Sequence, residues 1–171
     1  MEGTKIGLEI HIELDTASKL FCSCPTEAVQ PNSATCPTCL GLPGGKPVLN
    51  RTALEFGLKI AAALSCTIAA QLVFSRKSYF YPDMAKNFQI SQYELPLGMN
   101  GVLKLGNREI AITRVHLEED PAALEHAKDY VLVDYNRSGR PLCEIVTEPV
   151  LASPAEARAF VRALMTLLRV L

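Results

Sequence analysis

An alternation of apolar and polar residues is the first regular pattern in the chain, and it covers residues 5–14. One parity holds Ile6, Leu8, Ile10, Ile12 and Leu14. The other parity holds glycine and charged or polar side chains. Because successive side chains of a strand point to opposite faces, the pattern predicts a β-strand with one buried face and one polar face.

Two segments carry apolar residues at helical spacing. The first covers residues 51–65, with Leu54, Leu58, Ala61 and Leu64 on one stripe. Asn50 or Thr52 is suited to cap it, and Glu55 would complete a capping box with Thr52. The second begins with the capping sequence Ser153-Pro154-Ala155-Glu156 and continues with Ala159, Ala163, Leu167 and Val170 or Leu171. Since this pattern meets no stop signal, we expect the chain to be part of a longer protein.

Strands and loops are expected between the two helices. Residues 72–74 suit a short strand, and residues 75–100, with two prolines, suit a long loop. One hairpin is expected between residues 102–105 and 109–117, and another between residues 130–135 and 142–146. The apolar parity changes between Ile112 and Val115, which indicates a β-bulge near Thr113.

Composition and charge limit the class of protein. The 171 residues suit one domain, and an apolar content of 49% is enough to bury a core. The 17 basic and 18 acidic residues give a net charge of −1, which excludes a generally basic nucleic-acid coat protein. No apolar run approaches the roughly 20 residues that span a bilayer. The N-terminal residues also lack the apolar core of a signal peptide. We therefore expect a cytoplasmic protein without a membrane partner.

Four of the six cysteines form two close pairs, Cys22 with Cys24 and Cys36 with Cys39. Zinc favours four soft ligands, commonly supplied by two such pairs, and a metal would order a Pro- and Gly-rich loop that has no core of its own. The spacing favours a structural zinc knuckle over residues 22–39, with free buried thiols or a disulfide as the alternatives. Cys66 and Cys143 lie in apolar stretches and suit the core.

A second candidate metal site combines acidic residues with a histidine. Glu9 and His11, followed by Glu13, share the polar face of the first strand. The run His116-Leu117-Glu118-Glu119-Asp120 ends a later strand, where adjacent acids repel one another unless a cation or solvent neutralises them. Strand parity favours Glu118 as the ligand, and Glu144 offers a further carboxylate. Such a set suits Mg²⁺, although a solvated strand face is the simpler interpretation.

Basic and aromatic residues gather in the middle of the chain, where nine of the 17 basic residues lie between positions 76 and 140. Cations neutralise phosphates and tyrosine rings stack on bases, so a nucleotide or RNA could bind there, unless the rings are core residues flanked by solvated charges. The candidates are Lys77, Tyr79, Tyr81, Lys86, Arg114 and Arg137. The sequence holds no Gly-Lys-Ser/Thr phosphate loop, dinucleotide fingerprint or Gly-x-Ser-x-Gly elbow.

Eight blocks of the sequence occur in a recognisable order: Ile6–His11, Lys19–Cys22, Cys36–Gly44, Arg76–Asp83, Gln89–Tyr93, His116–Asp120, Val133–Gly139 and Glu144–Pro149. Together they resemble the B subunit of the glutamine-dependent aspartyl/glutamyl-tRNA amidotransferases, the GatB/GatE family. The resemblance spans essentially the whole chain and leaves open a B-type or an E-type chain. It implies an α/β (α+β) fold, a glutamine-synthetase-like cradle on an antiparallel sheet with a zinc knuckle insertion.

The resemblance also implies a reaction. ATP activates the side-chain carboxylate of Asp-tRNA(Asn) or Glu-tRNA(Gln), and ammonia from a glutaminase subunit then forms the amide. Expected cofactors are structural Zn²⁺, Mg²⁺ and ATP; expected partners are the glutaminase (A) subunit, the small (C) subunit and the misacylated tRNA. Residues 1–171 would be the N-terminal part of the cradle domain, without the helical and tail domains, and inactive alone.

Residue by residue, the family pattern agrees with the candidates above. It places Mg²⁺ at Glu9 and His11 and favours Glu119 over Glu118, so both glutamates remain candidates, as does Glu144. The four paired cysteines match the family's zinc knuckle. Two alternatives without catalysis remain: a zinc-stapled RNA-binding module, and a scaffold whose acidic patch docks a partner. The substrate, Asp-tRNA(Asn) or Glu-tRNA(Gln), is left open.

Overall fold

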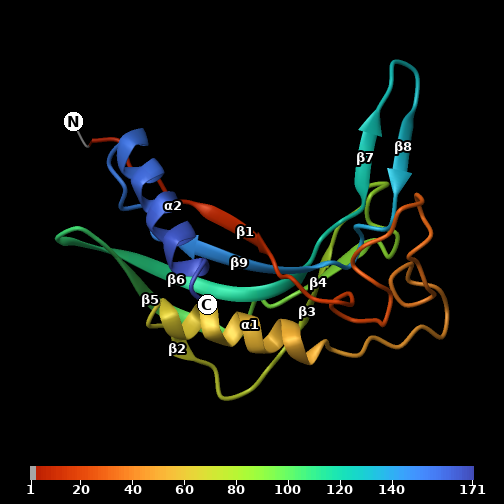
Figure 1. Cartoon of the computed structure of the whole chain (residues 1–171), viewed down its shortest axis with the longest axis horizontal. Helices are drawn as coiled ribbons and strands as arrows, with labels where there is room; N and C mark the ends of the chain where they lie inside the picture. Colours follow the sequence, from red (N-terminus) through yellow and green to blue (C-terminus); the bar gives the residue numbers. More distant parts are fainter. Residues whose placement is uncertain (1–2) are drawn as a thin grey trace.

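A five-stranded antiparallel sheet with two helices on one side forms the centre of the computed structural model, which describes residues 3–171 (Figure 1). The helices are α1 (Arg51–Ala63) and α2 (Pro154–Leu168). The central sheet has the order β1 (Glu9–Glu13), β9 (Pro141–Thr147), β6 (Arg108–Glu119), β5 (Gly98–Leu105) and β2 (Thr67–Ile68). Two hairpins flank it, β3 (Ser75–Ser78) with β4 (Phe88–Ser91), and β7 (Ala123–His126) with β8 (Val131–Asp134). The expected mixed α/β fold on an antiparallel sheet is confirmed.

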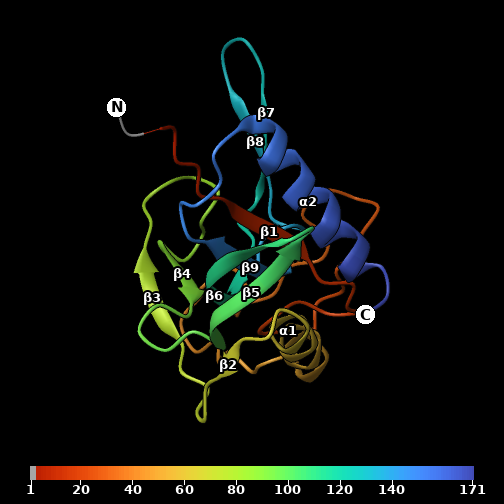
Figure 2. The same ribbon diagram turned by 90° about the vertical axis from the view of Figure 1, so that its left-hand side faces the viewer.

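The central sheet has an apolar face and a polar face. Its apolar face packs against α1 and α2 through fully buried side chains such as Leu117, Ile145 and Phe160. Figure 2 shows the β3–β4 hairpin on the opposite side of the sheet from the helices. The polar face of β1, β9 and β6 is therefore covered in part by this hairpin, and the space between them holds the candidate site.

The bulge expected near Thr113 is confirmed. The register between β6 and β9 shifts between Ile112 and Arg114, so Ile112 and Val115 are both buried although their sequence parity differs. The extra residue turns the following odd positions toward the core. Because of this shift, the even positions from Arg114 onward lie on the polar face.

The helices begin where the sequence predicts, with small differences. The Asn50 side chain caps α1 by accepting from the Thr52 and Ala53 amides, whereas Glu55 pairs with Arg51 and no capping box forms. Its most buried residues are Ala53, Gly57, Ile60, Ala61 and Leu64, so Leu54 and Leu58 lie at the margin of the buried stripe. In α2, capped by Ser153, the buried residues are Phe160 and Leu164, one position beyond the expected Ala159 and Ala163.

Three expectations about strands are wrong. Residues 72–74 form no strand, and the expected loop at 75–100 contains β3, β4 and the start of β5. Residues 131–134 pair with β7, whereas β9 lies between β1 and β6. Strand pairing over long sequence separations depends on tertiary packing, which local turn signals do not encode. The β7–β8 hairpin instead projects from the body as an arm (Figure 1).

Residues 22–39, the cysteine knuckle, contain no regular strand or helix longer than a turn but are held to the base of this arm. Asn32 accepts from the Tyr135 amide and donates to Val133 O, while the Asn136 side chain binds Ala34 N and Gln30 O. These bonds place the knuckle beside residues 133–136. Within residues 3–171, no helix combines the length and apolar character needed to cross a membrane.

Candidate metal and nucleotide site

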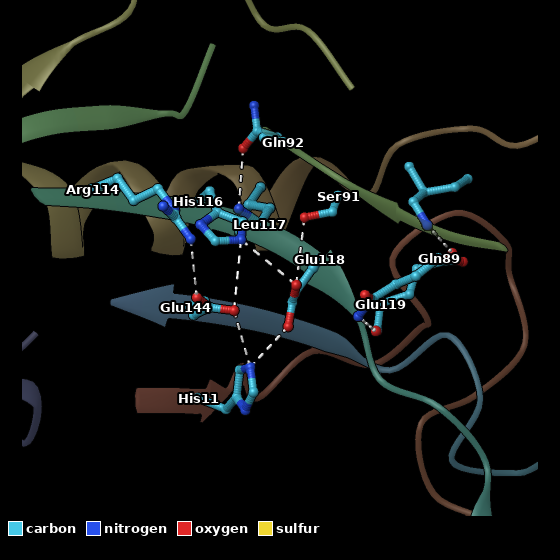
Figure 3. Close-up of polar contacts among 11 residues, drawn as sticks. His11, Gln89, Ser91, Gln92, Arg114, His116, Leu117, Glu118, Glu119 and Glu144 are labelled. Atoms are coloured by element: carbon cyan, nitrogen blue, oxygen red, sulfur yellow. Dashed lines mark hydrogen bonds and ion pairs between the residues drawn. The ribbon is translucent and has the colours of Figure 1, made fainter. Parts of the chain in front are cut away.

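Three potential metal ligands converge on the polar face of the sheet because of strand register. His11 on β1 is the direct cross-strand partner of Glu144 on β9, and Glu144 is in turn the partner of His116 on β6. Glu118 lies two residues further along β6, on the same face (Figure 3). The His11 Nε2 atom lies 2.9 Å from Glu118 Oε1 and 3.1 Å from Glu144 Oε2. Ligand atoms of His11, Glu118 and Glu144 all lie within 4.8 Å of one another.

The two adjacent glutamates of β6 take different places. Glu118 faces the cluster, as strand parity predicts, whereas the Glu119 carboxylate points away from it (Figure 3). The Glu119 carboxylate pairs instead with Lys86. Glu119 also accepts a hydrogen bond from the Ile90 amide at 3.1 Å. The geometry therefore places Glu118, not Glu119, beside His11. Glu9 shares the face, two residues from His11, but stands outside the converging group.

Electrostatics favour a charged carboxylate at Glu118. Burial by itself would raise the Glu118 pKa, but hydrogen bonding and charge from His116 act against it. The charges of His11 and Lys77 act in the same direction, and the net pKa lies below the ordinary value. A buried carboxylate that stays ionised among other acids is suited to bind a cation.

His116 is a member of this cluster that sequence reasoning left out of the ligand candidates. Its side chain is 4% exposed, and its Nε2 lies 3.5 Å from Glu118 Oε2 and 3.7 Å from Glu144 Oε2. The Nδ1 atom is buried and has no hydrogen-bond partner among residues 3–171. The parity that assigned Glu118 to the open face applies equally to His116, so the signal was present in the sequence.

Two adjoining hollows open on either side of the cluster. One, of about 370 Å³, is lined by basic residues Arg76, Lys77 and Arg114, with Tyr93 at its rim. The other, of about 300 Å³, is lined by His11, Lys77, Tyr79 and Asp120 among others. Four side chains line both hollows: Glu9, Lys77, Glu118 and Glu144. The cluster therefore lies between two hollows that both carry acidic residues, and the first of them has more basic residues.

The predicted basic and aromatic residues divide into two groups. Lys77, Tyr79 and Arg114 line the hollows, and Arg114 Nη2 lies 3.8 Å from Glu144 Oε1. Lys86 is buried against Glu119, and Arg137 donates to the Pro121 and Ala122 carbonyl oxygens, so both have partners within the chain. Tyr81 is 51% exposed beside the Tyr79 ring, outside the residues that line the hollows.

Asp120 contributes an unusual titrating group to the second hollow. Burial raises the pKa of this carboxyl to about 6, despite the opposing charge of Arg137, whose Nε lies 3.4 Å away. The carboxyl can therefore exchange a proton near neutral pH.

The four paired cysteines form a second candidate metal centre. The sulfur atoms of Cys22, Cys24, Cys36 and Cys39 lie within 4.8 Å of one another, although the pairs are eleven residues apart. All six cysteines are free thiols; Cys143 lies in the core, and the half-buried Cys66 packs against it. The clustering predicted from spacing is confirmed.

A fully buried lysine accompanies this cluster. Lys19 is 0% exposed; its Nζ donates to Ala34 O at 2.8 Å and Tyr135 O at 3.1 Å, and lies 3.8 Å from Cys39 Sγ. A hydrogen bond from the Cys22 thiol lowers the Cys39 pKa to about 4, against burial and with help from the Lys19 charge. A buried ammonium group needs a nearby anion, and the thiolate supplies one. Lysine is seldom buried, so no sequence signal indicates this role.

Comparison with known proteins matches the chain to one family. The family model of the GatB/GatE catalytic domain matches residues 4–171. The aspartyl/glutamyl-tRNA(Asn/Gln) amidotransferase B subunit of Moorella thermoacetica is 56% identical, over 97% of this chain and 37% of the relative. The subunits of the same name from Thermus thermophilus and Methanospirillum hungatei are 52% and 53% identical, over 97% and 98% of this chain and 36% and 38% of the relatives.

The chain thus spans little more than a third of the length of these curated relatives. Within that span the agreement is continuous, since both the family model and the relatives cover almost every residue. The chain belongs to the GatB/GatE catalytic domain family.

Proposed function

We propose that the chain is the N-terminal part of the cradle domain of an amidotransferase B subunit, the part where ATP activates a tRNA-bound carboxylate. The substrate would be Asp-tRNA(Asn) or Glu-tRNA(Gln). Its side-chain carboxylate attacks the γ-phosphate of ATP and releases ADP; ammonia then attacks the acyl phosphate and releases phosphate, leaving the amide. The observation that carries this proposal is the converging group of His11, Glu118 and Glu144 between two hollows.

The donor set suits a hard divalent cation. Two buried carboxylates and an imidazole within 4.8 Å of one another are a set that Mg²⁺ or Mn²⁺ accepts, and without a cation the two negative charges would repel. His11, Glu118 and Glu144 would hold Mg²⁺, with Glu9 beside them; Glu119, already paired with Lys86, is a weaker candidate. When bound, Mg²⁺ supplies positive charge that stabilises phosphoryl transfer.

The remaining residues would bind and orient the reactants. Lys77 and Arg114 line the first hollow and would neutralise phosphate oxygens, while Tyr79 offers a ring at the second hollow. Holding the carboxylate and the γ-phosphate in one geometry is the main part of catalysis in phosphoryl transfer. Tyr81, Lys86 and Arg137 would act from outside the hollows, on the tRNA or by positioning neighbouring segments.

The cysteine knuckle would hold a structural zinc ion. Four thiolates close a tetrahedral sphere, and the zinc–tetrathiolate group would carry negative charge that the buried Lys19 ammonium offsets. The Lys19 ammonium favours an anionic cluster over four neutral thiols, and a zinc–tetrathiolate group is anionic.

A complete enzyme would need partners. The chain shows no glutaminase nucleophile motif in its sequence, so ammonia would come from a glutaminase (A) subunit that assembles with this chain and a small (C) subunit. Such an enzyme would work in the cytoplasm, where misacylated tRNA is available. The relatives' names, as B subunits of amidotransferases, support the need for partner subunits.

The test uses the full-length chain assembled with its partner subunits. His11→Ala should lower ATP-dependent amide formation on misacylated tRNA at least about 100-fold, the scale expected for lost electrostatic stabilisation, and leave glutamine hydrolysis without tRNA intact. Glu13→Gln, on the same strand face but 64% exposed at its side chain, is the matched control and should stay near the normal rate. Amide formation by the His11 variant at close to the normal rate would contradict the proposal.

A further inference from the structure

The buried ion pair of Lys86 and Glu119 lies between the candidate active site and the cysteine knuckle. The two side chains are 7% and 3% exposed. Glu119 also accepts from the Ile90 amide, and its backbone oxygen accepts from Gln89 Nε2 at 2.7 Å. The position of Glu119 is thereby tied to β4, which covers the polar face of the sheet.

The knuckle contacts this pair through a glycine. Gly41, two residues after Cys39, has a φ of +70°, and a Cβ atom there would lie 2.5 Å from Lys86 Cγ and 3.0 Å from Lys86 Cα. Such distances are too short for any side chain, and one of the contacted atoms is backbone. The bare backbone of Gly41 therefore forms the surface on which Lys86 rests.

A second glycine, Gly139, lies near both Cys39 and Glu119, at ordinary van der Waals distances. A Cβ atom at Gly139, where φ is +83°, would lie 3.7 Å from both Cys39 Cβ and Glu119 Oε1. It would also lie 3.6 Å from Cδ of Lys19, whose ammonium group approaches Cys39. Gly139 thus lies beside both Cys39 and Glu119, while Gly41, two residues after Cys39 in the chain, packs on Lys86.

The conformation of Gly41 follows from the cysteine turn. Its amide donates to Thr38 O at 3.2 Å, and the next amide, of Leu42, donates to Pro37 O at 2.8 Å. Both acceptors lie between Cys36 and Cys39, in the turn that those two sulfurs would close on a metal. Fixing the two sulfurs fixes the turn, and the turn places Gly41.

We propose that Gly41 is a positioning residue through which the metal-loaded cysteine knuckle holds the Lys86–Glu119 pair in place at the edge of the active site. Zinc would therefore set the geometry of that pair as well as order its own loop. The inference depends on the zinc site proposed above and not on the amidotransferase reaction.

Hydrogen exchange of two amides in the full-length chain provides the test. The Ile90 amide donates to Glu119 and reports the position of the pair, whereas the Leu117 amide donates to Gln92 Oε1 and reports the neighbouring strand contact. In Gly41→Ala, Ile90 should exchange at least about tenfold faster than in the unmodified chain, with Leu117 changed by less than about twofold. Zinc content should stay at about one per chain, because no ligand is altered.

Gly44→Ala is the matched control. Gly44 also has a positive φ, of +86°, but a Cβ atom there would meet nothing within 4 Å. The control carries the same kind of backbone strain without the contact, so Ile90 exchange should be unchanged. Unchanged Ile90 exchange in Gly41→Ala, or equal acceleration in both variants, would overturn the proposal.

Zinc removal provides an independent test in case the Gly41→Ala variant does not fold. Stripping zinc from the unmodified chain with a chelator should accelerate Ile90 exchange well beyond that of Leu117, and returned zinc should reverse it. Equal changes at the two amides, or none, would refute the positioning role. A purified chain that contains no zinc would refute the zinc site itself, while the comparison of the two glycine variants would still decide whether Gly41 holds the pair.

Discussion

The His11 imidazole lies 3.1 Å from the Glu144 carboxylate because the two residues are direct cross-strand partners of β1 and β9. His116 on β6 is the cross-strand partner of Glu144 on its other side. One exposed and one buried imidazole therefore flank a buried carboxylate. The exposed ring is suited to bind metal, and the buried ring is suited to orient the carboxylates.

We expect His116 to act through Glu118 and Glu144. His116→Leu removes the Nε2 donor and should weaken Mn²⁺ binding to the full-length chain about 10- to 100-fold, as for other groups that orient metal ligands. His116→Gln, which can still donate from a similar position, should retain most of the affinity. Titration calorimetry measures both.

His126→Leu is the control for this prediction, because His126 is exposed on the β7 strand of the arm. Its Mn²⁺ affinity should equal that of the unmodified chain. If His116→Leu binds Mn²⁺ as tightly as the control, the buried ring does not orient the carboxylates.

Sequence periodicity was enough to place several of these residues. Alternation put Glu9 and His11 on one face of β1, and the parity change at the bulge put Glu118 on the open face of β6. Local spacing also brought the four cysteines together. Each of these patterns depends on the geometry of one short segment, which a single sequence can encode.

Contacts between segments that are distant in the chain could not be predicted from the sequence. The long loop expected at residues 75–100 contains the β3–β4 hairpin, because its pairing is supported by burial against the sheet as well as by local propensity. The burial of Lys19 depends on carbonyl groups at positions 34 and 135, which lie far from it in the chain. No local pattern distinguishes such a lysine from a solvated one.

Glu118 and Glu119 should respond differently to substitution. Glu119→Gln leaves the Lys86 ammonium buried without its counter-charge and should lower the free energy of unfolding by about 3 kcal/mol. The double variant Glu119→Gln/Lys86→Met removes both charges and should recover much of that loss. Denaturant unfolding measures the difference, and additive effects of the two substitutions would contradict a coupled buried pair.

Glu118→Gln should instead reduce metal affinity with a smaller effect on stability. The Glu118 carboxylate faces His11 and Glu144, so its loss removes a candidate ligand and also relieves repulsion between two acids. Mn²⁺ titration of Glu118→Gln and Glu119→Gln side by side checks the assignment. Stronger loss of affinity in the Glu119 variant would favour Glu119 as the ligand.

Asp120 should titrate near pH 6 in the metal-free protein, since burial raises its pKa to about 6. The folded chain then binds more protons than the unfolded chain between about pH 4 and 6, so the free energy of unfolding falls as pH rises through this interval. Asp120→Asn should remove that dependence. Arg137→Gln should raise the midpoint further, because the Arg137 charge opposes the shift. Carboxyl carbon chemical shifts report the titration, and an ordinary midpoint near 4 would contradict it.

The cysteine knuckle gives the last prediction, which concerns thiol chemistry. Purified under reducing conditions, the protein should contain about one zinc per chain, and its four knuckle thiols should resist alkylation because they are bound to metal. A strong chelator should expose all four. Cys143 should stay unreactive as long as the fold persists, because complete burial raises its pKa and blocks the reagent.

Cys39→Ser should lose zinc, whereas the control Cys66→Ser should keep it. Mass spectrometry of the alkylated protein locates each label, and a disulfide between any two knuckle cysteines in a reduced preparation would exclude the zinc site.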